Sequence, residues 1–340
     1  MQPELALDTQ IVAANARAWR AFAGVPLYAV VKGEGYGWGY APLIRALEGI
    51  ADGYCVADAD ELREIRKHTQ APAVVLGSVE PDQLAAVYRA NAQPSIGTVT
   101  ELEIAEHVFA QIGRPLCVRV GVRPAAAWTG LTVEEVRTFA PALAKAGARV
   151  QLWTHITDFD ARAAQLENFR AAAQAMEAAG VDLEGTDVAS TFPLGADGPL
   201  AGMVRVGVGL FGATGGFDIP GIRCALRVIA PVIRVERHPA GTRLGYGGTM
   251  LADGETVATA RCGYADGLPK TLEGADDILS VGMQYVTVRA SRLDPESRQL
   301  VLLGSEANLD EFASRSGRLP HEIVTAFGNR ARASGVSVEV

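Results

Sequence analysis

The sequence predicts an α/β protein, a (β/α)8 TIM barrel followed by a mainly β C-terminal domain. Three observations predict this fold. Eight short apolar segments alternate with stretches of helical periodicity, 340 residues leave room for a barrel of roughly 250 residues and a second domain, and the pattern changes after Gly215. A doubly wound parallel sheet is the alternative, and the count of eight strands favours the barrel.

The eight predicted strands are rich in Val, Ile and Leu and lack strict alternation, which is typical of parallel strands buried on both faces. Good helix formers separate most of them, as in ADADELREIRKH (57–68) and FDARAAQLENFRAAAQAMEAAG (159–180). The strands are LYAVVKG (27–33), GYCVAD (53–58), PAVVLG (72–77), PSIGTV (94–99), PLCVRVGV (115–122), VQLWTHI (150–156), TDVAS (186–190) and MVRVGVGLFG (203–212).

Beyond Gly215, short β-type runs alternate with turn residues. The runs are LRVIAPVIRVERH (226–238), ETVATARCGYAD (255–266), QYVTVRASRL (284–293) and QLVLLG (299–304), with one helix expected at LDEFASRSG (309–317). We therefore expect a barrel domain over residues 8–220 and a mainly β domain over residues 221–340. Residues 1–7 are expected to form a strand that can join the second domain.

Composition excludes several classes of function. The net charge is −8 with no cluster of Lys and Arg, so no nucleic-acid partner is expected. No apolar run approaches the ~18 residues of a membrane span, and the N-terminus does not resemble a signal peptide. The four cysteines are far apart, which indicates a cytoplasmic protein without a metal site. They are Cys55, Cys117, Cys224 and Cys262.

In a barrel of this kind, the active site lies at the C-terminal ends of the strands. Five polar residues fall there: Lys32, Asp58, His155, Ser190 and Arg205. The lysine ends an apolar strand, where an ammonium group would be costly to bury. A lysine that forms a Schiff base avoids that cost. A lysine that extends from the strand end into solvent is an equally good interpretation.

Two features indicate a phosphate site. Glycines alternate in GEGYGWG (33–39), and such a turn before a helix can present backbone N–H groups to a phosphate. Barrels also bind phosphate with the loops after strands seven and eight, where Ser190 and the Gly207–Val208 backbone are found. Each signal is weak by itself, because glycine runs also mark plain turns and a serine such as Ser190 also serves as a helix N-cap.

Several motifs resemble those of one family, the alanine racemases, which are fold-type III enzymes that use pyridoxal 5′-phosphate (PLP). AVVKGEGYGWG (29–39) resembles the family's AVVKANAYGHG, and RCGYADGLPK (261–270) resembles its IGYADGYPR. MVRVGVGLFG (203–212) is similar to VRPGIALYG, GYGGTM (245–250) is similar to SYGATW, and VASTFPL (188–194) lies where the family has its phosphate serine. The motifs follow the family's order at similar spacings.

The resemblance implies a cofactor, a mechanism and a set of site residues. Lys32 would hold PLP covalently and act as one acid–base group, while Tyr264 would be the opposing one. That tyrosine would come from the partner subunit of a head-to-tail homodimer. Arg205 would bond the pyridine nitrogen, and His155 would support the cofactor ring or pair with that arginine. The residues expected to hold the phosphate are Tyr36, Ser190, Gly207 and Val208.

The chain departs from the family where the substrate is recognised. The family's KVDTGMxRLG reads VRVGVRPAAAWTGL (118–131), so Trp128 stands at the arginine position, and Arg119 or Arg123 is a candidate replacement for the charge. Met283 of the family's MDQ segment is retained, but Gln284 replaces the aspartate. We expect Met283 and Trp128 to contact the substrate. The family's C-terminal phosphate tyrosine is also absent.

The sequence is therefore identified as a divergent member of the family. The first hypothesis is a PLP-dependent amino-acid racemase that moves the α-proton with two bases, Lys32 and Tyr264. The second is another PLP reaction on the same scaffold, namely decarboxylation, retro-aldol cleavage or transamination in a biosynthetic pathway. The third is a weakly catalytic PLP-binding protein. The amino acid that serves as substrate is not evident from the sequence.

Overall fold

The computed structural model describes residues 2–125, 129–156, 160–188, 202–245, 249–275, 277–293 and 297–334. The chain forms two compact units. The barrel unit comprises Ala16–Gly33 and Leu47–Gly207, and the sheet unit comprises Met1–Asn15, Glu34–Ala46 and Val208–Val340. Each unit is described by itself below.

The barrel unit contains eight parallel strands in its described part. Two sheets have the orders β5-β4-β3-β2-β9 and β6-β7-β8. A bridge between Ser95 and Arg119 joins them on one side, and the Gly202 N–H donates to Thr186 O (2.5 Å) on the other. This arrangement confirms the predicted fold class. The strands are β2 (Leu27–Val30), β3 (Gly53–Val56), β4 (Ala73–Val75), β5 (Ala92–Gln93), β6 (Cys117–Gly121), β7 (Arg149–Trp153), β8 (Asp182–Asp187) and β9 (Val204–Val206).

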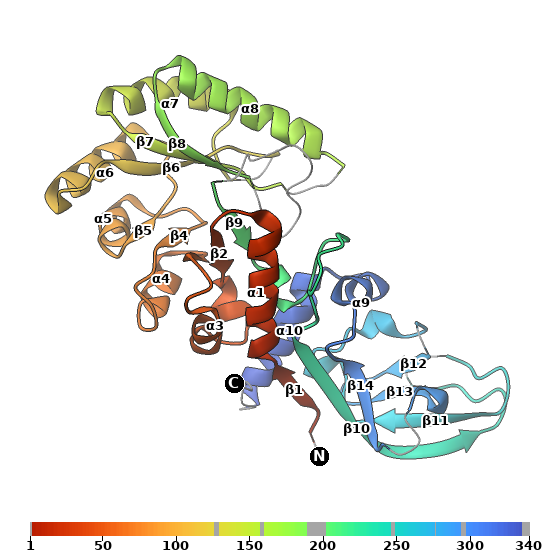
Figure 1. The fold of residues 1–340 in the computed structure, drawn as a ribbon. Helices are drawn as coiled ribbons and strands as arrows, with labels where there is room; N and C mark the ends of the chain where they lie inside the picture. The colour runs from red at the N-terminus through yellow and green to blue at the C-terminus, as the bar shows by residue number, and fades with distance from the viewer. Residues whose placement is uncertain are drawn as a thin grey trace. The chain divides into compact units, whose positions relative to one another are not determined.

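Helices follow the strands of this unit, and polar caps begin several of them. The Asp58 side chain caps α4, while Thr98 and Thr132 form capping boxes with Glu101 and Glu135 at the starts of α6 and α7. In Figure 1, α7 and α8 cover one face of strands β6–β8. The helices are α4 (Ala59–Ile65), α5 (Pro81–Arg89), α6 (Val99–Ile112), α7 (Val133–Ala146) and α8 (Arg162–Ala178).

Two strands differ from their predicted positions. The fourth strand was expected over 94–99 but ends at Gln93, because Pro94 has no N–H with which to continue the ladder. The seventh was expected to begin at Thr186 but begins at Asp182. Its polar DLEGTD sequence has no apolar pattern to mark a strand, and pairing with β7 forms it nonetheless.

The sheet unit contains an antiparallel sheet with the order β1-β10-β11-β13-β12, and β14 also pairs with β10. Strand β10 (Leu226–His238) pairs with different neighbours along its length, and its register with β11 shifts between Val232 and Arg234. Its first half pairs with β1 (Glu4–Leu7) and β14 (Gln299–Leu303), and its second half pairs with β11 (Glu255–Ala260). The two remaining strands are β12 (Ile278–Val281) and β13 (Val286–Arg289).

The helices of the sheet unit include one that the sequence interpretation missed. The expected helix is α9 (Leu309–Arg315), and α10 (Pro320–Ala333) follows it. A proline at the first position and buried Ile323, Val324 and Phe327 are signals that could have identified α10. Helices α1 (Thr9–Ala23), α2 (Lys32–Tyr36) and α3 (Tyr40–Leu47) contain the points where the chain passes between the units.

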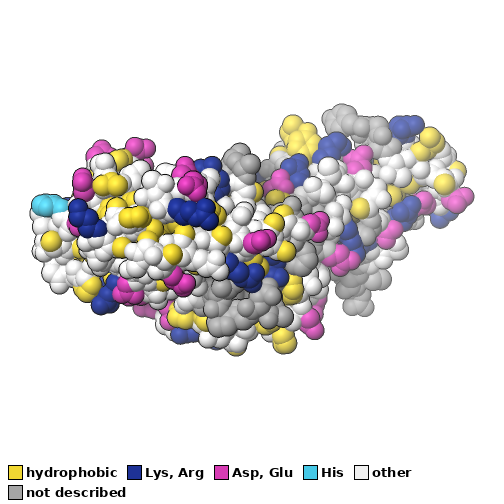
Figure 2. Space-filling model, turned by 90° about the horizontal axis from the view of Figure 1, so that it is seen from above, with side chains coloured by type: hydrophobic (Ala, Val, Ile, Leu, Met, Phe, Trp, Pro, Cys, Tyr) yellow, Lys and Arg dark blue, Asp and Glu magenta, His cyan; other side chains and the backbone are white. Residues whose placement is uncertain are grey.

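The molecular surface carries charges of both signs. Figure 2 shows acidic and basic side chains interspersed on one face, without a large patch of either sign. Among the described helices, none combines the length and the apolar character that crossing a membrane requires.

Candidate active site

Three of the predicted site residues line one cavity of the barrel unit. Lys32, His155 and Arg205 border a cavity of about 370 Å³. Lys32 follows β2, His155 follows β7 and Arg205 lies in β9, so the cavity is at the carboxyl ends of the strands. Its volume is within the range of roughly 300–1,000 Å³ that is typical of small-molecule sites. The remaining lining residues are Ala57, Leu76, Gly77, Thr129 and Trp153.

The Lys32 side chain is exposed rather than buried. The expected cost of burying its ammonium group therefore does not arise, because the residue lies just beyond the end of β2 at the mouth of the cavity. Lys32 thus extends toward solvent, one of the two interpretations of its position at the strand end, and burial gives no reason for a covalent link. What supports the role of Lys32 is its place in the cavity wall beside His155 and Arg205.

The glycine-rich segment after Lys32 forms a left-handed turn. The φ angles of residues 33–37 are +63°, +55°, +64°, +55° and +84°. Glycine adopts this conformation without steric penalty, but Glu34 and Tyr36 each incur about 1–2 kcal/mol. Alternating glycines thus reduce the cost of a turn that reverses the usual helical hand. Strain of this kind persists only where the surroundings enforce it, and it is concentrated at functional sites.

Contacts within each unit hold the two ends of this turn. In the barrel unit, Glu61 accepts hydrogen bonds from Gly33 N (2.6 Å) and Ala57 N (2.7 Å). In the sheet unit, Trp38 Nε1 donates to Val324 O of α10 (3.2 Å). A Cβ at Gly37 would lie only 2.6 Å from the backbone nitrogen of Asn329. The backbone of this segment and α10 can approach closely only because Gly37 has no side chain.

A buried ion cluster holds Arg205. Its Nε donates to Asp187 Oδ1 (3.0 Å) and its Nη2 to Thr154 O (2.7 Å). Arg119 binds the other oxygen of the same carboxylate, with 2.8 Å between Nη2 and Oδ2. The Trp153 ring lies under both guanidinium groups, 4.9 Å from that of Arg205 and 5.7 Å from that of Arg119. All three charged side chains are almost fully buried.

This cluster carries two cations and one anion, so it presents a net positive charge beside the cavity. Charges out of water interact strongly, and a guanidinium remains protonated under all ordinary conditions. Two nitrogens of Arg205 are used by Asp187 and Thr154, which fixes the plane of the group. A ligand with an electron-rich ring nitrogen would find a rigid donor there. The residues of the cavity therefore fit a pyridine-type cofactor.

One buried nucleophile near the cluster is chemically inert. Cys55 of β3 is completely buried, and burial raises the pKa of its thiol to about 12 although Arg205 and Arg119 act in the opposite direction. The thiolate is the reactive form of cysteine. Cys55 is thus a structural residue and not a catalytic one.

In the sheet unit, Tyr36 packs beside the 3-10 turn η1 (Val208–Phe211). The Tyr36 ring is buried, with its centroid 5.2 Å from that of Phe211 and 6.1 Å from that of His321. Val208 is the first residue of that turn, whereas Gly207 is the last residue of the barrel unit. Tyr36 therefore packs against the last residue of the turn that Val208 begins.

Tyr264 begins a short turn, η2 (Tyr264–Asp266), and lies next to Met283. The Tyr264 N–H donates to Gly282 O (3.0 Å), and the Ala265 N–H donates to Met283 O (2.9 Å). The side chains of Tyr264 and Met283 are 43% and 55% exposed. The fold thus brings together two residues that were predicted from motifs in separate parts of the sequence.

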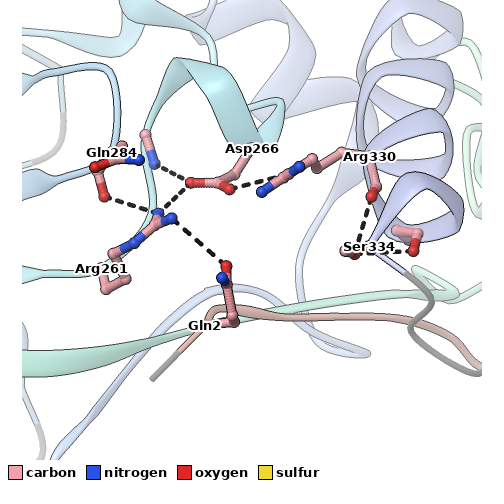
Figure 3. Close-up of polar contacts among 8 residues, drawn as sticks. Gln2, Arg261, Asp266, Gln284, Arg330 and Ser334 are labelled. Atoms are coloured by element: carbon pink, nitrogen blue, oxygen red, sulfur yellow. Dashed lines mark hydrogen bonds and ion pairs between the residues drawn. The ribbon is translucent and has the colours of Figure 1, made fainter.

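The buried carboxylate of Asp266 holds the base of this turn (Figure 3). It accepts hydrogen bonds from Arg261 Nη1 (2.6 Å), Arg330 Nε of α10 (3.2 Å) and the Gly263 backbone (3.1 Å). Arg261 also reaches Gln284 O and the Gln2 side chain. The aspartate of GYADG therefore anchors the tyrosine beside it, a role that the motif alone did not reveal.

Some site residues were missed, and others lie outside the described residues. Ser190 and Trp128 belong to the latter group. Sequence reasoning overlooked Asp187 and Trp153, and considered Arg119 only as a substitute for a lost charge. The available signal was a charged residue inside a barrel strand, as at Asp187 of β8.

Comparisons with known proteins identify the family. The model of the alanine racemase N-terminal domain matches residues 7–215, and that of the alanine racemase C-terminal domain matches residues 225–334. The chain belongs to the alanine racemase family. Members of this family are PLP-dependent isomerases.

Relatives and solved structures agree with this assignment. The alanine racemase of Pseudomonas taetrolens is 28% identical over 95% of this chain and 96% of its own length, and one from Cereibacter sphaeroides is 29% identical over 96% of both. The alanine racemase structure from Streptomyces lavendulae covers 97% of this chain and 96% of its own, with a TM-score of 0.81 and 23% identity. That of the Bartonella henselae alanine racemase with covalently bound pyridoxal phosphate covers 97% and 98%, with a TM-score of 0.79 and 20% identity. The structures show that this family member has the fold of alanine racemases.

Proposed function

We propose that this protein is a PLP-dependent amino-acid racemase in which Lys32 and Tyr264 are the two acid–base groups. The observation that carries the proposal is the cavity shared by Lys32, His155 and Arg205, in a chain that belongs to the alanine racemase family. The proposal includes a cytoplasmic head-to-tail homodimer, with a barrel domain over 8–220 and a mainly β domain over 221–340.

The residues of the chain would hold PLP at three points. Lys32 would bind it covalently and Arg205 would donate to its pyridine nitrogen, with His155 beside the ring. The phosphate would be held by Tyr36, Ser190, Gly207 and Val208, of which Ser190 lies outside the described residues. When bound, PLP withdraws electrons from the α-carbon of the amino acid and thereby acidifies its α-hydrogen. A guanidinium at the ring nitrogen donates a hydrogen bond without protonating the ring, which limits this withdrawal and suits a reversible proton transfer.

Inversion at a carbon requires a base on one face and an acid on the other. Lys32 would move the α-proton on one face and Tyr264 on the other, each contributing roughly two to four powers of ten to the rate. The exposure of Tyr264 supports its contribution to the site of a partner subunit. Met283, next to the Tyr264 turn, would contact the substrate. Trp128, outside the described residues, is proposed for the same role.

The test is α-hydrogen exchange in deuterium oxide. The holoenzyme is incubated with a panel of L- and D-amino acids, and deuterium at Cα, chirality and product mass are followed together. Lys32→Ala should abolish exchange, and Tyr264→Phe should abolish inversion while leaving exchange from one face. Tyr285→Phe is the matched control, since Tyr285 is a similarly exposed tyrosine of the same unit.

Three outcomes would contradict the proposal. Release of carbon dioxide or an aldehyde would establish a different PLP reaction. Undiminished inversion in Tyr264→Phe would remove the tyrosine from the mechanism. Absence of exchange with every amino acid, in protein that has bound PLP, would leave a binding protein without racemase activity on these compounds.

A further inference from the structure

A second cavity adjoins the one that contains Lys32. Its volume is about 230 Å³, and it shares Leu76, Gly77, Thr129 and Trp153 with the first. Its other lining residues are the last residue of β6 and residues that follow β4, β5 and β6, so it also lies at the carboxyl ends of the barrel strands. Both cavities belong wholly to the barrel unit. A molecule bound at Lys32 has this space directly beside it.

Small residues keep the second cavity open. A Cβ at Gly97 would lie 2.9 Å from Leu131 Cδ2, and one at Gly121 would lie 3.1 Å from the Trp153 ring. A side chain at either position would therefore displace a residue that lines the cavity. Trp153 is also held in place, because its Nε1 donates to Ser95 Oγ (2.7 Å). The space thus has walls of defined position, with apolar surface from Leu76 and Leu131.

One carboxylate lies in this mainly apolar lining. Glu101 is the single charged side chain among the described residues that border the cavity. Its Oε2 accepts hydrogen bonds from Gly97 N (2.8 Å), Thr98 N (2.8 Å) and Thr98 Oγ1 (2.8 Å). Its Oε1 takes none of these three bonds. A cation beside Glu101 would have a negative partner there, and the described lining of this cavity contains no Lys or Arg.

We propose that this second cavity receives the side chain of the substrate, and that the preferred substrate is an amino acid whose aliphatic side chain ends in a cation. The inference rests on the proposed racemase function and specifies its substrate class. The apolar walls match an aliphatic stem, and the carboxylate matches a terminal ammonium or guanidinium group. A methyl side chain would leave most of the space unfilled.

Replacing Glu101 with glutamine tests the charge without removing the helix cap, since glutamine also completes a capping box. Exchange of the α-hydrogen is measured for L-lysine, L-norleucine and L-alanine at a series of concentrations. We expect Glu101→Gln to lower kcat/KM for lysine on the order of ten- to hundredfold, mainly through KM, and to leave norleucine and alanine nearly unchanged. Glu135→Gln is the control, because Glu135 forms the same capping box in α7 and does not line the cavity.

Filling the cavity is the second test. Leu131→Phe should reduce exchange of lysine and norleucine at least tenfold relative to alanine. Leu116→Phe is the matched control. Leu116 is a half-buried leucine that precedes the first residue of β6, whereas the second cavity lies at the other end of that strand. Binding is followed independently of catalysis with N,N-dimethylpentylamine, a cation that cannot form an imine. It should quench tryptophan fluorescence in the wild type, with a Kd that Glu101→Gln raises.

The outcomes separate this inference from the proposed function. If no amino acid exchanges its α-hydrogen, the racemase proposal fails. If alanine is exchanged fastest, or if lysine exchange is insensitive to both Glu101→Gln and Leu131→Phe, the racemase proposal stands and the assignment of the second cavity is wrong. If norleucine is preferred over lysine, the cavity still receives the substrate side chain, but the proposal that this side chain ends in a cation is wrong.

Discussion

Replacement of Asp187 with asparagine should destabilise the protein severely while leaving the shape of the side chain unchanged. Among the described residues, Asp187 is the one anion that pairs with the guanidinium groups of Arg119 and Arg205, and all three side chains are almost fully buried. Asparagine keeps one acceptor but turns an NH₂ group toward a guanidinium donor. Two buried cations are then left without a counter-charge.

Breaking a buried ion pair by removing one partner costs about 3–5 kcal/mol, because the remaining charge is uncompensated. We expect a loss of this size for Asp187→Asn. The double variant Arg119→Met/Asp187→Asn should be less damaging than the sum of its single changes, because it removes one of the stranded cations. Glu134→Gln breaks an exposed pair with Arg137 and should cost less than about 1 kcal/mol.

The assay is urea denaturation followed by far-ultraviolet circular dichroism. The free energies of unfolding are compared between variants whose dependence on urea concentration has the same slope. A loss below about 1 kcal/mol for Asp187→Asn would refute the reasoning, because it would mean that the two arginines do not depend on that carboxylate. Additive effects in the double variant would refute the claim that Arg119 and Asp187 act together.

Three further predictions concern stability. Gly37→Ala should lower the free energy of unfolding by about 1–3 kcal/mol in urea denaturation, because the new Cβ meets the backbone of α10. The control Gly24→Ala has a similar positive φ and no neighbour within 4 Å, so it should cost about 1 kcal/mol. Equal losses in the two variants would contradict the packing argument. Burial raises the pKa of the Cys55 thiol to about 12 from its ordinary value of 9.0. Between these two pH values the unfolded chain loses a proton that the native state keeps. The free energy of unfolding should therefore fall as pH rises from 9.0 to about 12. Cys55→Ala should flatten that fall in urea midpoints measured against pH, and an unchanged slope would show that other groups cause it. Asp266→Asn should lower the free energy of unfolding by about 3 kcal/mol and slow α-deuterium exchange, because the turn that carries Tyr264 loses its anchor; an unaltered exchange rate would show that the anchor is dispensable.

The fold class could be predicted from the sequence, and so could three residues that line the candidate cavity. Apolar runs separated by helical stretches indicate a barrel, because each buried strand must present hydrophobic residues on both faces. The rule that barrel sites lie at the carboxyl ends of strands selected Lys32, His155 and Arg205, which line one cavity in the structure. The motifs around Lys32 and Tyr264 led to the correct family because they are specific combinations of residues at defined spacings.

How these residues are supported becomes visible only in the tertiary structure. Asp187, Arg119 and Arg205 come from three different strands, and only strand order and register bring both guanidinium groups within 3.0 Å of the Asp187 carboxylate. The left-handed backbone conformation of residues 33–37 likewise could not be predicted from the sequence. Alternating glycines are compatible with many kinds of turn, and packing selects one of them. The second cavity keeps its walls in place because Gly97 and Gly121 have no side chains that would displace Leu131 and Trp153. Long-range packing sets all of these features, and local sequence patterns carry no record of it.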